Sequence, residues 1–235
     1  MGFDVFYPYL PIKDKIGSRH NDLELRYSLR SIEKNLSGFD RVFIAGETVP
    51  DWLTNVVHLP IKDDPKRVPD WNIMNKVSNA DGISENFLFI NDDHFIMKPY
   101  QVETFPNYYH STLDIYCRRR GRDGYGYRAI NTKNWLVEQG LKLLHFDIHY
   151  PIIYNLKAFR EVMDKVPWDK EKHGFIVKSL YGNYMKLPGT YTYDNKTSKI
   201  DPRLPVFSTY PHMTISLMNY LKAILPKPSR FEKTT

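Results

Sequence analysis

Residues 87–90, with the sequence FLFI, constrain the fold of this chain more than any other segment. Four consecutive apolar residues predict a strand that is buried on both faces, which is typical of the middle of a parallel sheet covered by helices. Asn91, Asp92 and Asp93 follow directly. Open α/β sheets bind ligands at the carboxyl ends of their strands. We therefore expect this NDD segment to lie at the ligand-binding edge of the sheet.

The segments before this run alternate between strand and helix patterns. Residues 3–7, 41–46 and 55–61 are short apolar runs typical of strands. A helical spacing of apolar residues fills the gap between the first two runs: Leu25, Leu29, Ile32 and Leu36. A second helix, containing Trp71 and Met74, precedes the FLFI run. Strands joined by helices in this order predict an α/β fold with a mainly parallel, twisted sheet.

Local signals predict where these helices begin and end. Asn21 and Glu24 have the spacing of a capping box at the start of the first helix. Gly38 is expected to close that helix, and Gly82 the second, because glycine readily ends a helix.

The pattern is less regular beyond Pro99. Residues 155–166 predict an amphipathic helix that stops before Pro167, and residues 170–185 a further helix-like segment. Residues 214–225 predict a helix that either packs on the domain or lies on a membrane surface, of which packing is the commoner outcome. No repeat or linker divides the chain, so we expect a single domain over residues 1–235.

Charge and cysteine content narrow the classes of partner. The net charge of +6 favours an acidic partner: nucleic acid, an anionic membrane face or a phosphorylated donor. Positive residues gather in residues 117–128 and in the C-terminal tail, as either a solvated loop or an anion-binding one. The single cysteine, Cys117, excludes an intramolecular disulfide and fits a reducing cytoplasm. The first ten residues resemble a strand and not a signal peptide, and no segment is apolar enough to cross a bilayer.

The NDD segment carries the clearest chemistry. Adjacent carboxylates after a buried strand repel each other unless a cation or hydrogen bonds compensate. Mg²⁺ or Mn²⁺ uses few protein carboxylates and completes its shell with substrate phosphates, so Asp92 and Asp93 are candidate ligands for a metal bound to a nucleotide diphosphate. Alternatively, these residues simply form a turn, as Asn and Asp often do.

A second candidate group lies at residues 146–151. Asp147 and His149 are two positions apart and face one way in an extended segment, so His149 could complete the metal site. The other interpretation is a buried, hydrogen-bonded histidine. A general base near an acceptor hydroxyl must be a carboxylate here, with Asp147, Asp93 and Glu47 as candidates in that order.

Basic side chains on the two early helices could bind a diphosphate. Arg26 and Arg30 are one helical turn apart, and Lys76 lies near Asn72 and Asn75. Arginine and lysine compensate the charge that develops on a leaving nucleotide diphosphate. The alternative is a solvated helix face with local ion pairs.

The segments NDLELRYSLRSIEKN, VFIAG, PDWL, WNIMNK and FLFINDDHF together resemble the conserved core of the Stealth family of hexose-1-phosphate transferases of capsule synthesis. The chain is also similar to small phage-type glycosyltransferases. The resemblance covers about the first hundred residues and resumes at FDIHYPIIYN through KSLYGNY. The opening FDVFYPYLPIKD departs from the family's first motif, and the shortness of the chain favours plain glycosyl transfer.

This resemblance implies a GT-A-like nucleotide-sugar fold and a set of site residues. Residues 1–100 would form the nucleotide-sugar-binding half, and residues 101–235 the acceptor-side half with a C-terminal helix and basic tail. The predicted catalytic residues are Asp93 and Arg26, which the resemblance implies, and Asp147, the candidate general base given above. The implied metal ligands are Asp92, Asp93 and His149. We expect the donor, a UDP-sugar with Mn²⁺ or Mg²⁺, to be bound by Arg26, Asn72, Asn75 and Asp92, which the resemblance implies, and also by Tyr7 and Lys76, which it does not.

Three functions remain open from sequence. The leading hypothesis is a metal-dependent glycosyltransferase that modifies a hydroxymethylated base in phage-type DNA, with Arg118, Arg119, Arg120 and Arg122 on phosphates. The second is Stealth-type transfer of a sugar or sugar phosphate to a capsular or cell-surface polysaccharide. The third is a non-catalytic nucleic-acid-binding module.

Overall fold

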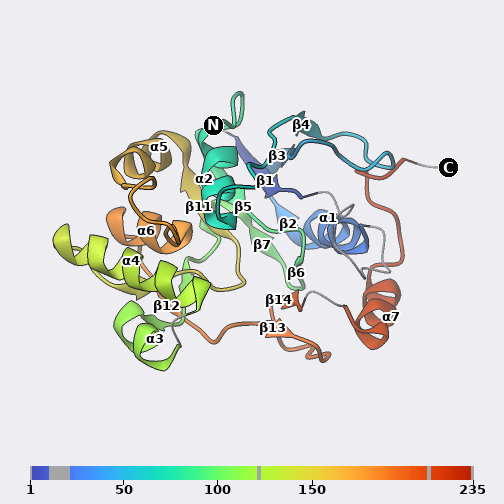
Figure 1. The fold of residues 1–235 in the computed structure, drawn as a ribbon. Coiled ribbons are helices and arrows are strands. Elements are labelled where there is room, and N and C mark those ends of the chain that lie inside the picture. The colour runs from blue at the N-terminus through green and yellow to red at the C-terminus, as the bar shows by residue number, and fades with distance from the viewer. Residues whose placement is uncertain (1, 11–21, 121–122, 211–212, 234–235) are drawn as a thin grey trace.

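A five-stranded sheet forms the centre of the molecule in the computed structural model, which describes residues 2–10, 22–120, 123–210 and 213–233 (Figure 1). Its strand order is β11-β5-β1-β3-β4. The three pairings among β5, β1, β3 and β4 are parallel, and β11 joins β5 antiparallel. The strands are β1 (Phe3–Pro8), β3 (Phe39–Ala45), β4 (Val57–Leu59), β5 (Asn86–Phe89) and β11 (Ile152–Asn155). The predicted mixed α/β architecture with a mainly parallel sheet is confirmed.

Strand β5 is buried on both faces, as the FLFI run predicts. Phe87 and Phe89 pack into the apolar core on one side of the sheet, whereas Leu88 and Ile90 pack into the core on the other side. Successive side chains in a strand point to opposite faces, so an unbroken apolar run supplies both layers. The NDD segment therefore leaves the middle of the sheet at its carboxyl edge.

Helices cover both faces of the sheet (Figure 1). One face packs against α1 (Leu23–Asn35), whose Leu25, Leu29 and Ile32 are buried. The helices on the other side are α2 (Pro69–Ser78), α4 (Gly124–Glu138), α5 (Leu156–Lys165) and α6 (Val177–Tyr184). The predicted α5 ends before Pro167, as expected.

A third, smaller core lies between α7 (Ile215–Ile224), β6 (His94–Ile96) and β14 (Val206–Thr209). Leu217 and Leu221 of α7 are buried against Phe95 and Phe207. The expectation that this helix packs on the domain is confirmed. Within the described part of the chain, no helix is both long and apolar enough to cross a membrane.

The helix ends differ from the prediction. Helix α1 stops at Asn35 because the chain continues at once into β2 (Leu36–Ser37), which pairs with β7 (Tyr100–Gln101). Gly38 is wrong as the helix end: with φ of +83° it forms the turn into β3 instead. Gly82, with φ of +77°, likewise lies in a turn beyond the end of α2. The predicted capping box includes Asn21, which is outside the described residues.

The chain beyond Pro99 contains two helices that have no clear sequence signal, α3 (Leu113–Arg119) and α4. Glycines and β-branched residues give α4 a weak helical propensity, and burial of Ala129, Trp135 and Leu136 offsets it. The remaining short elements are η2 (Val102–Thr104), β8 (Tyr108–Tyr109), β9 (Ser111–Thr112), β10 (Leu144–His145), β12 (Thr190–Tyr191) and β13 (Lys196–Thr197).

Candidate functional site

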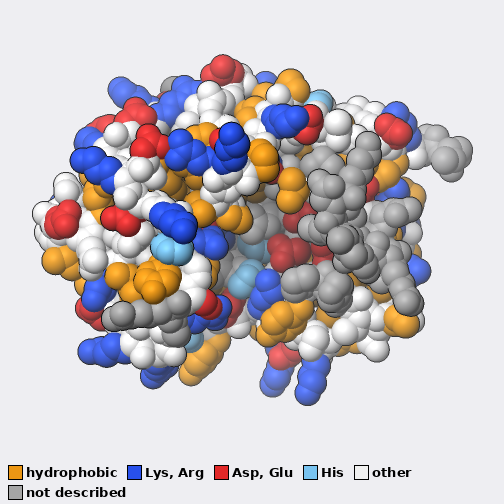
Figure 2. Space-filling model, in the orientation of Figure 1, with side chains coloured by type: hydrophobic (Ala, Val, Ile, Leu, Met, Phe, Trp, Pro, Cys, Tyr) orange, Lys and Arg blue, Asp and Glu red, His pale blue; other side chains and the backbone are white. Residues whose placement is uncertain are grey.

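A cleft of about 760 Å³ opens beside the carboxyl end of β5, and Asn91 of the NDD segment lines it. Figure 2 shows a hollow near the middle of this face, with acidic, histidine and basic side chains around it. The ionisable side chains that line the cleft are Asp70, Asp147, Asp194, His110, His145, His149, Arg120, Lys178 and Lys196. Charges of both signs therefore face one open volume.

Asp147 is held at the cleft by neighbours that stay neutral. The Tyr125 hydroxyl donates a hydrogen bond to Asp147 Oδ2 and lies 3.4 Å from His145 Nε2. Burial, with the charge of Asp147, raises the pKa of Tyr125 well above its usual value. Burial also lowers the pKa of His145, so its imidazole is neutral at pH 7. Asp147 is thus oriented as an acceptor, which is the geometry a general base requires.

Asp70 lies in the same cleft but in a different environment. It forms an ion pair with Arg128 and is 7% exposed. Burial raises the pKa of Asp70 to about 6, and the negative charge of Asp147 adds to the rise while Arg128 opposes it. A buried carboxyl group whose pKa is raised in this way, inside a cleft, is a candidate for proton transfer.

His149 also lines the cleft and has polar contacts at both ring nitrogens. Its Nδ1 lies 2.8 Å from Asp194 Oδ1, and its Nε2 lies 3.2 Å from Lys196 Nζ. Burial opposes ionisation of Asp194, but hydrogen bonds from the side chain and backbone of His149 outweigh it and lower the pKa of Asp194 to about 2. Both ring nitrogens of His149 therefore have polar neighbours, and its role as a metal ligand with Asp92 and Asp93 stays a prediction.

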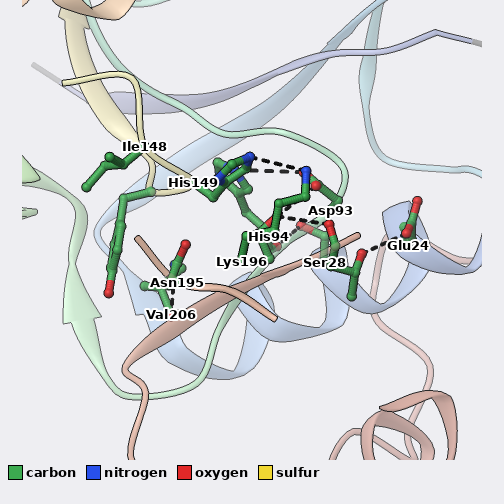
Figure 3. A network of polar contacts seen from close by, with 12 residues as sticks. Glu24, Ser28, Asp93, His94, Ile148, His149, Asn195, Lys196 and Val206 are labelled. Carbon is green, nitrogen blue, oxygen red and sulfur yellow. Dashed lines mark hydrogen bonds and ion pairs between the residues drawn. The ribbon is translucent and has the colours of Figure 1, made fainter. Parts of the chain in front are cut away.

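His94 lies beneath His149, at 6.3 Å between ring centroids (Figure 3). It is fully buried, and neither ring nitrogen has a hydrogen-bond partner. Burial lowers the pKa of His94 well below its usual value, and the nearby positive charge of Lys178 lowers it further. His94 is therefore a neutral side chain that supports the floor of the site.

The two acids of the NDD segment are half-buried and have different surroundings. Asp93 Oδ2 accepts a hydrogen bond of 2.7 Å from Ser208 on β14. Burial raises the pKa of Tyr7 and Tyr9, and the charge of Asp92 raises both further, so Asp92 lies near the end of β1. Among the described residues, no group of three or more His, Cys, Asp or Glu side chains is arranged to hold a metal. Mg²⁺ and Mn²⁺ need only one or two protein carboxylates when phosphates complete the shell, so either of these acids has the chemistry such a metal needs.

The other predicted donor-binding residues have partners within the protein. Tyr7 is fully buried, and its hydroxyl lies 2.9 Å from Ser28 Oγ. Lys76 is also buried and donates to the carbonyl oxygen of Tyr9 and to Asp63, both at 2.8 Å. Asn72 bonds the backbone of the loop at Asp64. These side chains position loops at the sheet edge and do not line the cleft.

Asn75 and Glu47 also lie outside the cleft. The Asn75 side chain accepts a hydrogen bond of 3.0 Å from Asn79 along α2. Glu47, the third candidate for the general base, is exposed and lies 3.2 Å from Lys62.

Arg26 is paired with a residue near the C-terminus and does not line the cleft. Arg26 and Arg30 both form ion pairs with Glu232, and the guanidinium of Arg26 also stacks over Trp52 at 4.1 Å. The Glu232 side chain is 1% exposed, so its charge is enclosed by the two arginines. We call Arg26, Arg30 and Glu232 the C-terminal clasp. The structure therefore does not bring Arg26 together with Asp147.

The predicted phosphate-binding arginines divide between surface and cleft. Arg118 and Arg119 are exposed at the end of α3. Arg120 lines the cleft and lies 3.2 Å from Asp123. Arg122 lies outside the described residues.

Comparison with known proteins shows a family similarity in the N-terminal part of the chain. Residues 19–113 match the family model described as Stealth protein CR2, conserved region 2. The chain is Stealth-like. We call residues 19–113 the Stealth region. It contains α1, β3, α2, β5 and the NDD segment, so it forms the sheet edge beside the cleft.

Curated relatives of the Stealth-like chain carry related names. It is 28% identical over 158 residues to an exopolysaccharide phosphotransferase of Streptomyces coelicolor, covering 59% of this chain and 17% of that protein. A second protein of that organism and name is 36% identical over 93 residues, covering 35% of this chain and 16% of its own length. A capsular polysaccharide phosphotransferase of Neisseria meningitidis serogroup B is 25% identical over 171 residues, covering 64% of this chain and 44% of that protein. The chain spans less than a fifth of the Streptomyces proteins.

The cleft also contains residues that sequence reasoning missed: Asp70, His145, Lys178, Asp194 and Lys196. Lys178 is buried and donates hydrogen bonds of 2.9 Å to the carbonyl oxygens of Ile148 and Tyr150. It falls within KSLYGNY, where the Stealth resemblance resumes, so that signal could have identified it. Asp194 and Lys196 lie in an irregular segment outside the Stealth region and carry no such signal.

Proposed function

We propose that this chain transfers a hexose 1-phosphate unit from a nucleotide-sugar to a hydroxyl group of a polysaccharide. The observation that carries the proposal is the position of Asp147, oriented by Tyr125 in an open cleft beside the NDD segment of the Stealth region. The names of the curated relatives support a polysaccharide acceptor. They favour it over the DNA acceptor that charge and aromatic content suggest.

In the proposed reaction, the acceptor oxygen attacks the phosphorus that carries the sugar. The bond between that phosphorus and the bridging oxygen breaks, and nucleoside monophosphate leaves. Asp147 takes the proton of the acceptor hydroxyl, so the product is a glycan joined to the hexose by a phosphodiester. Lys178, Lys196 and Arg120 supply positive charge around the cleft, which favours the added negative charge of the transition state.

The donor diphosphate is proposed to lie at Asp92 and Asp93, in a GT-A-like arrangement with UDP as the nucleotide. A Mg²⁺ or Mn²⁺ ion held by these two carboxylates would neutralise part of the phosphate charge. Burial lowers the pKa of Lys178, whereas the charges of Asp147 and Asp93 oppose this, so the side chain lies near both carboxylates. Asp93 is consequently a donor-side residue in this proposal and Asp147 an acceptor-side one.

Product mass tests the reaction class. The purified chain would be incubated with UDP-sugars, Mn²⁺ and a capsular polysaccharide, and the acceptor analysed by mass spectrometry. We expect a gain of hexose phosphate and the release of UMP. A gain of hexose with release of UDP would overturn phosphotransfer in favour of plain glycosyl transfer. Labelling of hydroxymethylated DNA but not of polysaccharide would restore the DNA acceptor.

A further inference from the structure

An exposed group of aromatic side chains stands at the border of the cleft. Tyr191 on β12 and Tyr193 just after it are 54% and 73% exposed. His110 packs against both, with ring centroids 6.0 Å from Tyr191 and 5.8 Å from Tyr193. We call His110, Tyr191 and Tyr193 the aromatic platform. Adjacent exposed apolar side chains, in contrast to scattered ones, mark binding surfaces.

The platform is held in place by backbone as well as ring contacts. Strand β12 pairs in parallel with β8, so that Tyr191 is opposite Tyr109. The N–H of Thr192 donates to the carbonyl oxygen of Tyr109 at 2.9 Å, and His110 Nδ1 lies 3.0 Å from the carbonyl oxygen of Thr192. The rings of Tyr191 and Tyr193 meet edge to face at 71°. These contacts fix the ring planes before any ligand arrives, which reduces the entropy lost on binding.

His110 connects the platform to the reaction site, because it also lines the cleft that contains Asp147. A ligand whose reacting group lies at Asp147 can therefore extend past His110 onto the two tyrosines. On the donor side, the NDD segment follows β5 in the central sheet, whereas β12 and β8 form a separate pair of strands. The platform therefore lies on different strands from Asp92 and Asp93, where the donor diphosphate is proposed to bind.

We propose that Tyr191 and Tyr193 bind a pyranose ring of the acceptor glycan, next to the sugar whose hydroxyl reacts. The C–H face of a pyranose is apolar with a slight positive charge, and it stacks on the negative face of an aromatic ring. The tyrosine hydroxyl groups stay at the rim, where they can bond sugar hydroxyls. The assignment of the occupant as an acceptor rests on the proposed function, whereas the stacking of a sugar ring does not.

Direct binding of oligosaccharides tests the proposal in the absence of nucleotide. Maltoheptaose and chitohexaose would be titrated into the full chain by calorimetry. We expect Tyr193→Ala and Tyr191→Ala each to weaken binding by about tenfold, as for loss of one aromatic stacking contact. Tyr193→Phe keeps the ring face and should retain most of the affinity. Ile215→Ala is the matched control, because Ile215 is 69% exposed on α7 and lies outside the cleft.

Three outcomes would overturn the sugar subsite: neither oligosaccharide binds, Tyr193→Ala binds as well as the unchanged chain, or the two alanine variants lose affinity for UMP instead. Thermal unfolding of each variant shows whether the fold is retained. Failure of the proposed function is distinguishable, because a gain of hexose in the product assay contradicts phosphotransfer without changing oligosaccharide affinity.

Discussion

The C-terminal clasp and the cleft contain similar charged residues in opposite situations. In the clasp, Arg26 and Arg30 enclose Glu232, whose side chain is 1% exposed. In the cleft, Asp147 and Lys178 face an open volume together with other acids and bases. Charges enclosed by partners stabilise a fold, whereas charges facing an open volume can act on a ligand. Residue type alone does not separate the two situations, because both use basic residues of predicted helices.

The largest effect that would test this contrast is on catalysis. Asp147→Asn keeps the shape of the side chain but removes the proton acceptor, so we expect hexose-phosphate transfer to fall by about 100-fold to 10,000-fold. Thermal unfolding should change little, since asparagine can still accept the Tyr125 hydrogen bond. Steady-state kinetics measure the first effect and calorimetry the second. An unchanged rate would remove Asp147 from the reaction.

Glu232→Gln should give the reverse result, a loss of stability with normal activity per folded molecule. Burial opposes ionisation of Glu232, yet hydrogen bonds from Arg30, Ser229 and Arg26 outweigh it and lower its pKa from 4.5 to about 2. This stabilisation is therefore complete above about pH 4.5 and is lost as the pH falls through 2. At pH 7 the substitution should cost about 3 kcal/mol. Urea unfolding should show that the difference in the free energy of unfolding between the unchanged chain and Glu232→Gln is smaller at pH 3 than at pH 7. An equal difference at the two pH values would contradict this prediction.

Arg26→Ala sharpens the comparison further, because Arg26 is also a predicted donor-binding residue. We expect a loss of about 1–2 kcal/mol in the free energy of unfolding, from one charged hydrogen bond. Combined with Glu232→Gln, the losses should be less than additive, as for residues in direct contact. The KM for the nucleotide-sugar should stay within about twofold; a tenfold rise would assign Arg26 to the donor site.

Asp194→Asn should have the smallest effect. The folded-state pKa of Asp194 is about 2, below the usual 3.8, so its contribution is present above about pH 3.8 and lost as the pH falls through 2. Its side chain is 41% exposed, so solvent screening reduces that contribution to under about 1 kcal/mol. Thermal unfolding at pH 7 measures this contribution, with Asp201→Asn as the control, because Asp201 forms an ion pair with Arg203 and, unlike Asp194, does not line the cleft. A loss of more than about 2 kcal/mol in the free energy of unfolding would mean that Asp194 stabilises the fold as Glu232 does in the C-terminal clasp.

Long periodic or unbroken apolar patterns predicted the fold well. Strand β5 and helices α1 and α5 follow from local patterns, because burial of one stripe or of both faces requires apolar residues at set intervals. Helix α4 was missed because its residues are weak helix formers, and only packing in the tertiary structure makes it helical. Gly38 and Gly82 were misread because glycine with positive φ serves both helix ends and other turns.

The candidate site was predicted in part for similar reasons. Asp147 and His149 do line one cleft, but residues 148–150 form bends and Ile148 lines the same cleft, so the alternation of an extended segment is not the reason. Arg26 could not be assigned, since its partner Glu232 is 206 residues away in sequence. Asp70, Lys178 and Asp194 come from three further segments, and no local pattern links them.

The amino-acid sequence by itself determined the central strand and the position of Asp92 and Asp93 at its carboxyl end, because strand burial is read from neighbouring residues. It also determined the resemblance to the Stealth family. Only the tertiary structure decided which charges are enclosed and which face the cleft. Ion pairs form between segments that the chain brings together over long distances, and the identity of a charged residue does not specify its partner.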